Sequence, residues 1–211
     1  MIRRATREWA DGAMPAKRVT TAEALTSAAA TLFETRGYHN TTIDDIAEAA
    51  GVSRPTVYKY VPSKQALLDY LVDSICDAQE GELRAALTAG TGPLDRLSDL
   101  IGVHIESSIS RKPFYAIVFS EQIELSDKAR RRFHEFSHQV AADLQALLEE
   151  CLQSRPPSPV PVDTWIASNL VLSMLTSLYR WYDPTGPVGP DSLRRQISLL
   201  LEGILPTTAS K

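Results

Sequence analysis

The sequence of 211 residues has only two cysteines and no long apolar run. Cys76 and Cys151 lie far apart, each among residues with helical spacing, so we expect reduced core thiols and not a disulfide scaffold. No stretch approaches the roughly 20 apolar residues that a membrane span needs. The first 18 residues also lack the apolar core of a signal peptide. These absences predict a cytoplasmic protein.

The sequence also lacks the usual patterns of β proteins and of enzymes. It has no strand-type alternation of useful length, no internal repeat, no Gly-rich phosphate loop and no Ser-His-Asp context. Of its four histidines, His134 and His138 stand four apart with Glu135 between them. That pair can bind a metal, but a surface pair is the preferred interpretation. We therefore predict no catalytic residue, no metal site and no cofactor.

The charge is unevenly distributed along the chain. The formal net charge is −4, which on its own argues against a nucleic-acid ligand. Residues 1–64 hold nine Lys/Arg against seven Asp/Glu, a net +2, and residues 65–211 hold thirteen against nineteen, a net −6. The positive end is therefore the N-terminal one, where a DNA contact is most favourable.

Helical spacing of apolar residues predicts an all-α fold. Residues 1–18 read as a flexible basic arm, and the next helix ends near Gly37. Thr41 or Thr42 is a suitable N-cap for a second helix, and Gly51 supplies the left-handed turn after it. Later helices are predicted over residues 93–111, 113–119, 127–153 (with Asp127 as cap), 164–182 and 192–205, with a proline-rich connector over residues 154–163.

The stretch SRPTVYKY at residues 53–60 concentrates hydrogen-bond donors on a short helix. Ser53 caps this helix, Pro55 fits its first turn, and Val57 and Val61 face inward. The remaining polar groups then face outward, as on a recognition helix in the DNA major groove, with Arg54 suited to guanine O6 and N7. The predicted DNA-binding residues are Thr42, Ser53, Arg54, Thr56, Tyr58, Lys59, Tyr60 and Lys64.

Residues 33–68 resemble the N-terminal signature of the TetR family of transcriptional regulators. The match runs from Thr41 and Thr42 through AGVS at residues 50–53 to PSK at residues 62–64 and a leucine pair. Val61 and Gln65 depart from the usual phenylalanine and acidic residue. The resemblance implies a homodimeric repressor with a helix-turn-helix domain at residues 19–64. It also implies an effector-binding and dimerisation domain at residues 65–211.

Family resemblance implies that the last two helices, about 164–182 and 192–205, form the dimer, although an ordinary internal core explains their apolar character equally well. An apolar effector pocket is expected among His104, Tyr115, Phe119, Trp165, Met174 and Tyr179. Residues 178–196 are similar to the RWYxPxGP stretch of TetR members that govern lipid or sterol breakdown. Several of those members answer to acyl-CoA thioesters, so an acyl-CoA-like effector is one hypothesis. Arg180 or the basic group Lys128, Arg130, Arg131 and Arg132 can meet its anionic head group, but a solvated helix surface is the preferred interpretation of these residues.

Two other functions stay open at this point. The C-terminal half can be a protein-interaction module without a small ligand, or, with less support, an enzyme that uses its cavity. The sequence does not identify the operator, the effector or the regulated genes, nor does it decide between repression and activation.

Overall fold

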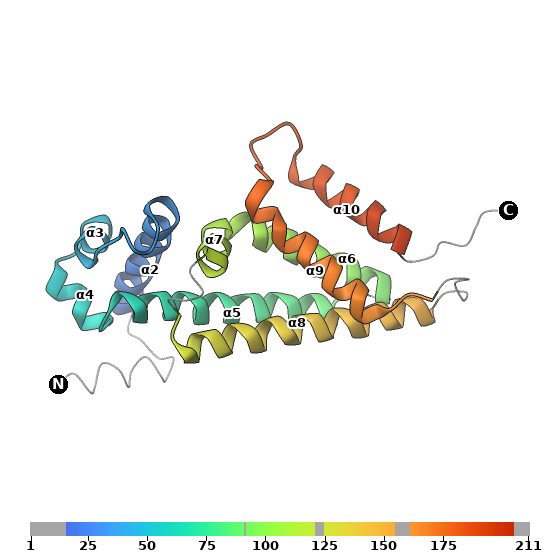
Figure 1. The fold of residues 1–211 in the computed structure, drawn as a ribbon, viewed down its shortest axis with the longest axis horizontal. Helices are drawn as coiled ribbons and strands as arrows, with labels where there is room; N and C mark the ends of the chain where they lie inside the picture. Colours follow the sequence, from blue (N-terminus) through green and yellow to red (C-terminus); the bar gives the residue numbers. More distant parts are fainter. Residues whose placement is uncertain (1–15, 91, 121–124, 155–160, 205–211) are drawn as a thin grey trace. The chain divides into compact units, whose positions relative to one another are not determined.

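The computed structural model describes residues 16–204 except 91, 121–124 and 155–160, and this part of the chain forms nine α-helices (Figure 1). The predicted all-α fold is confirmed. The helices are α2 (Ala16–Arg36), α3 (Ile43–Ala49), α4 (Arg54–Tyr60), α5 (Lys64–Thr88), α6 (Pro93–Ser110), α7 (Lys112–Ser120), α8 (Asp127–Gln153), α9 (Thr164–Trp181) and α10 (Pro190–Ile204). None of these described helices is long and apolar enough to cross a membrane.

Most helix ends agree with the sequence prediction, with two differences. Helix α2 begins at Ala16, so residues 16–18 of the predicted flexible arm are helical, and the rest of that arm lies outside the described residues. The cap of α8 is Ser126 and not Asp127, because the Ser126 hydroxyl accepts the Ala129 N–H at 3.2 Å. Residues 155–160 of the connector and residue 205 also lie outside the described part.

The chain divides into two compact units. The first takes the residues up to 75 together with 116–133, and the second takes 76–115 and 134 onward. The sequence placed a boundary after residue 64, whereas in the structure the first twelve residues of α5 fold with the N-terminal helices. Helix α5 therefore contributes to both units as one continuous element.

The first unit is organised by a small apolar core. Helix α3 packs against both α2 and α4. The side chains that these helices and the start of α5 bury include Leu25, Ala29, Phe33, Ile46, Ala47, Val57, Val61, Leu67 and Leu68. Because each helix buries only one stripe, its remaining faces stay exposed for polar groups.

In the second unit, α9 packs along α6, and α10 also contacts α6. The Ser108 hydroxyl on α6 donates to the Leu175 carbonyl on α9 at 3.1 Å, which satisfies a buried hydroxyl. Gly102 leaves room for the guanidinium of Arg194 on α10, since a Cβ there would lie 2.8 Å from Cζ of that side chain. The Arg194 guanidinium in turn donates to the Ser98 carbonyl at 3.2 Å.

Candidate nucleic-acid interface and effector site

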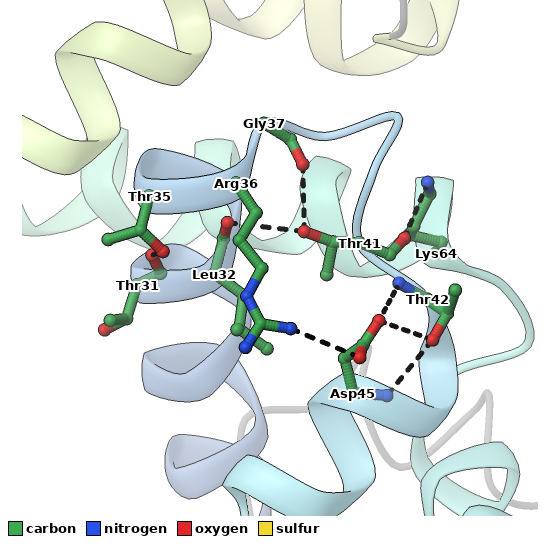
Figure 2. A network of polar contacts seen from close by, with 9 residues as sticks. All are labelled: Thr31, Leu32, Thr35, Arg36, Gly37, Thr41, Thr42, Asp45 and Lys64. Carbon is green, nitrogen blue, oxygen red and sulfur yellow. Dashed lines mark hydrogen bonds and ion pairs between the residues drawn. The ribbon is translucent and has the colours of Figure 1, made fainter.

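The start of α3 is fixed by reciprocal bonds between Thr42 and Asp45. The Thr42 hydroxyl accepts the Asp45 N–H at 3.1 Å, and the Asp45 carboxylate accepts the Thr42 N–H at 2.7 Å, which is a capping box. Hydrogen bonds from the Thr42 hydroxyl and N–H lower the pKa of Asp45. Arg36 at the end of α2 reaches the same carboxylate at 3.3 Å, so one acid joins two helices (Figure 2).

The turn between α3 and α4 has the hydrogen bonds of a Schellman motif. Gly51 adopts φ +67°, its N–H donates to Glu48 O, and the Val52 N–H donates to Ala47 O. A side chain at Gly51 would meet no atom within 4 Å, so the positive φ is what requires glycine. This turn sets the angle at which α4 leaves α3.

Helix α4 begins at its predicted cap and exposes its predicted polar face. The Ser53 hydroxyl accepts the Thr56 N–H at 3.4 Å and lies 2.8 Å from the Thr56 hydroxyl. Val57 is fully buried and Val61 nearly so. The exposed residues among those predicted to bind DNA are Thr42, Ser53, Arg54, Tyr58 and Lys59, while Thr56, Tyr60 and Lys64 are half-buried.

Arg54 opens α4 and is held from two sides. Its Nη1 donates to the Asp44 carboxylate on α3 at 2.7 Å, and its guanidinium carbon lies 5.8 Å from the centre of the Tyr58 ring. The Tyr58 hydroxyl first, and the Asp44 charge second, raise the pKa of Arg54. The group therefore stays cationic, as a guanine or phosphate contact requires.

Lys64 lies at the first position of α5 with its ammonium turned toward its own unit. Its Nζ donates to the carbonyls of Tyr38 and Thr41, at 2.7 and 2.9 Å, and lies 4.1 Å from the centre of the Tyr38 ring. The buried Thr41 hydroxyl is itself bonded to the Gly37 carbonyl at 2.9 Å (Figure 2). Lys64 thus ties α5 to the loop before α3, and its predicted phosphate contact stays a prediction.

The second unit contains a chain of polar groups, buried at Gln79, Ser107 and Tyr115 and reaching the surface at Arg111 and Glu82, that the sequence analysis missed. Arg111 donates to the Ser107 hydroxyl at 3.0 Å, and Ser107 lies 3.2 Å from the Tyr115 hydroxyl. Tyr115 and the Gln79 side-chain amide exchange bonds of 3.0 and 3.2 Å. Glu82 pairs with Arg111, and this pairing lowers the pKa of Glu82 and raises that of Arg111. The chain begins and ends on α5.

One signal in the sequence points to this chain. His104, Ser107 and Ser108 follow each other at helical spacing and continue the buried stripe of α6, and the half-buried Arg111 follows one turn later as the C-cap. Polar residues at such spacing are usually read as a solvated face, but here they occupy the inward one. Burial raises the pKa of the Tyr115 hydroxyl, which stays protonated and can donate.

The six residues predicted to contact the effector differ in burial, and they do not all belong to the same unit. Tyr115 stacks on Tyr179 with ring centres 6.1 Å apart, and His104 is buried with its Nδ1 3.3 Å from Leu100 O. Met174 is half-buried on α9, whereas Trp165 at the start of α9 is 64% exposed. Phe119 belongs to the first unit, where its ring packs edge-on against that of Phe133 with ring centres 5.9 Å apart.

Three of the basic residues considered for an anionic head group have partners within their own units. The Lys128 Nζ lies 3.7 Å from Oδ2 of Asp73. The Arg130 Nη1 lies 3.7 Å from Oδ1 of Asp127, and its Nη2 donates to the Leu125 carbonyl. These residues belong to the first unit, while Arg180 belongs to the second and donates to the Tyr179 hydroxyl at 2.8 Å. In the described residues, no three metal-binding side chains come together around His134 and His138 or elsewhere.

Comparison with known proteins agrees with this geometry. The family model described as "Bacterial regulatory proteins, tetR family" matches residues 25–71, and that described as "Tetracyclin repressor-like, C-terminal domain" matches residues 90–205. The second match alone covers more than half of the chain. The protein therefore belongs to the TetR family and is a DNA-binding transcriptional repressor of that type.

Individual relatives match over nearly the whole chain. The transcriptional repressor KstR2 of Mycolicibacterium smegmatis is 25% identical over 199 residues, which cover 93% of this chain and 97% of the relative. The structure of the ketosteroid regulator KstR2 of Mycobacterium tuberculosis matches with TM-score 0.79 at 23% identity, covering 93% and 98%. AibR, solved with isovaleryl coenzyme A and operator DNA, matches with TM-score 0.72 at 22% identity, covering 88% and 97%.

Replacing Lys64 by Met removes its two carbonyl bonds and its ring contact while keeping the aliphatic stem. We expect the free energy of unfolding, measured in urea, to fall by about 2 kcal/mol. We expect an unchanged slope of log DNA affinity against log salt, because the ammonium bonds within the protein. The exposed Lys59→Met is the control, which should keep its stability and lose about one unit of slope per phosphate contact. A lower slope with unchanged stability in Lys64→Met would contradict this role.

His104 makes folding stability depend on pH. Burial lowers its pKa from 6.5 to about 4, although the bond to the Leu100 carbonyl opposes this shift. The unfolded chain therefore binds a proton below about pH 6.5 that the folded chain does not bind until about pH 4, so stability is lost as pH falls.

We expect wild type to lose about 2 kcal/mol of unfolding free energy between pH 7 and 5 that His104→Gln does not lose. The exposed His138→Gln is the control and should follow wild type. Urea unfolding at both pH values measures the difference. Parallel pH profiles for wild type and His104→Gln would show that the ring is not held neutral.

Proposed function

We propose that this protein is a homodimeric repressor that binds a palindromic operator and leaves it when a hydrophobic effector, an acyl-CoA or a related lipid, binds the C-terminal half. The observation that carries the DNA part is the exposed polar face of α4, fixed by buried Val57 and Val61. A helix so placed at the end of a Schellman turn can enter a major groove with its N-terminal residues leading.

Arg54 is the residue that we propose to read a base. Its guanidinium can pair with guanine O6 and N7. The hydroxyls of Thr42, Ser53, Thr56, Tyr58 and Tyr60, with the ammonium group of Lys59, are proposed to contact phosphates and set the register. The Lys64 ammonium is left out of this proposal, because it bonds to two carbonyls of its own unit. Thr42 and Ser53 also cap helices, so their hydroxyls can serve DNA only while keeping those bonds.

The dimer is supported by apolar side chains that one copy of the chain leaves exposed. Helix α9 buries Ala167, Val171, Leu175 and Leu178, yet its other side exposes Ile166, Leu170 and Trp181. Leu199 and Leu200 on α10 are 54% and 65% exposed. Exposed apolar residues that form one contiguous surface are typical of a protein contact, and we propose that these residues do so. A second copy is the proposed occupant, because a palindromic operator requires two recognition helices.

The effector is proposed to contact Tyr115, Tyr179, Met174 and His104 in the second unit. The interior of the second unit is apolar except for the polar chain at Tyr115. Such an interior suits a hydrophobic ligand that carries one oxygen acceptor. AibR, solved with isovaleryl coenzyme A, is the similar structure that favours an acyl-CoA. Exposed Trp165 fits the proposed dimer surface better than an interior site.

Release is proposed to act through α5, which holds Gln79 and Glu82 in the polar chain and Lys64 at its first position. An effector that shifts α5 changes the separation of the two recognition helices. A preference of a few kcal/mol for the non-binding state is enough to empty the operator.

The double variant Leu170→Glu with Leu200→Glu places two carboxylates on the proposed dimer surface. We expect wild type to sediment as a dimer at micromolar concentration and the variant as a monomer with unchanged circular dichroism. Its affinity for DNA selected by the wild type from random sequences should fall at least about tenfold, since one half-site is lost. Leu94→Glu changes an exposed leucine on α6 and is the control. A double variant that remains dimeric would place the dimer contact elsewhere.

An acyl-CoA series tests the effector. In calorimetry we expect binding whose affinity rises with acyl length, by up to about 0.8 kcal/mol per buried CH₂, and coenzyme A alone to bind at least about tenfold more weakly. Tyr179→Ala should weaken binding, whereas Tyr58→Ala, an exposed tyrosine on α4, should not. No heat across the series would exclude this effector class and favour the protein-interaction alternative.

A further inference from the structure

Asp44 is an acidic residue on the surface that carries the proposed base reader. Its neighbour Asp45 serves the capping box and Arg36. Asp44 does neither, and its Oδ2 instead accepts the Arg54 Nη1 donor at 2.7 Å, across ten residues and from one helix to the next. Both side chains are more than half exposed, at 61% for Asp44 and 57% for Arg54.

Neither stability nor DNA attraction explains this pair. Exposed ion pairs add little to folding because water screens them. An acid in the first turn of α3 suits the helix dipole, but Asp45 already supplies one there. Toward DNA, the carboxylate repels phosphates and cancels part of the Arg54 charge. Because Asp44 both repels DNA phosphates and offsets the charge of Arg54, its presence is best explained by its effect on the orientation of Arg54.

The geometry leaves Arg54 able to read a base while it is held. Nη1 carries two N–H groups, and only one is needed for Asp44. The other, together with Nη2, forms the planar fork that matches guanine O6 and N7. With Asp44 on one side and the Tyr58 ring 5.8 Å from its guanidinium carbon, the side chain loses less freedom on binding than an unrestrained arginine.

We propose that Asp44 is a specificity-determining residue, which orients the Arg54 guanidinium for guanine and keeps it from pairing with phosphates of unrelated DNA. This inference rests on the proposed base reading by Arg54. Asp44 acts through Arg54, so its loss changes discrimination between sequences and not simply affinity.

The experiment uses the full-length protein and a duplex selected by the wild type from random sequences. Each base pair of that duplex is varied in turn, and affinity is measured by fluorescence anisotropy for wild type, Asp44→Ala, Asp44→Asn and Arg54→Ala. We expect Asp44→Ala to lose about fivefold or more of the discrimination at one G·C pair, because the Arg54 guanidinium is then no longer oriented for the base. It should also bind an unrelated duplex about threefold or more tightly, because one repulsive charge is gone.

Glu48→Gln is the matched control, since it removes a charge from the exposed side of the same helix without touching Arg54. It should tighten unrelated binding but keep full discrimination. Asp44→Asn retains an acceptor oxygen for Arg54 and should recover part of the discrimination. The midpoint of thermal unfolding is measured for every variant, and a midpoint equal to that of wild type shows that the fold is intact.

Two outcomes separate the inference from the function beneath it. If Arg54→Ala loses discrimination at the G·C pair while Asp44→Ala keeps it, the role of Asp44 is overturned and base reading by Arg54 stands. If Arg54→Ala discriminates as wild type does, base reading by Arg54 itself is wrong.

Discussion

The proposed DNA-reading surface, made of the residues predicted to bind DNA, depends on the burial of a few aliphatic side chains under two helices that are too short to be stable alone. Helices α3 and α4 have seven residues each, whereas isolated helices below about 12–15 residues are marginal in water. Burial of Ile46 and Val57 supplies the packing, and the caps at Thr42 and Ser53 supply partners for the free N–H groups. Because Val57 is buried, Arg54, Tyr58 and Lys59 must face outward.

The cations on this surface are held by the protein in different ways. Lys64 is satisfied by two carbonyls and a ring, so its charge serves the fold. Arg54 is held by an exposed carboxylate, which restrains its direction without burying it. Lys59 is exposed in the last turn of α4. A count of basic residues therefore overstates how many charges are available to DNA. The groups that each cation contacts within the protein decide whether its charge serves the fold or remains available.

Sequence reasoning succeeded where structure is set locally. Thr42, Ser53 and Pro93 mark helix starts, and Gly51 marks a turn, because caps and φ depend on a few neighbouring residues. It placed the cap of α8 at Asp127, one residue too late, because serine and aspartate are both good caps and the neighbouring Ser126 takes that role in the structure. Sequence reasoning missed the bond between Arg54 and Asp44, which are ten residues apart. It also missed the bond between Tyr115 and Gln79, which are 36 residues apart. Such pairs depend on tertiary packing and not on spacing.

Helix α5 is the element through which we propose that the effector and the proposed DNA-reading surface influence each other. It carries Lys64 at its start, and Gln79 and Glu82 lie three residues apart on it, bound by Tyr115 and Arg111 respectively. Each net hydrogen bond contributes about 1 kcal/mol, and more when charged. Exchanging two or three of them is thus comparable to the few kcal/mol that switch a population between two states. The polar chain gives α5 discrete partners to keep or lose, which an apolar contact would not, and this favours a two-state response over a gradual one.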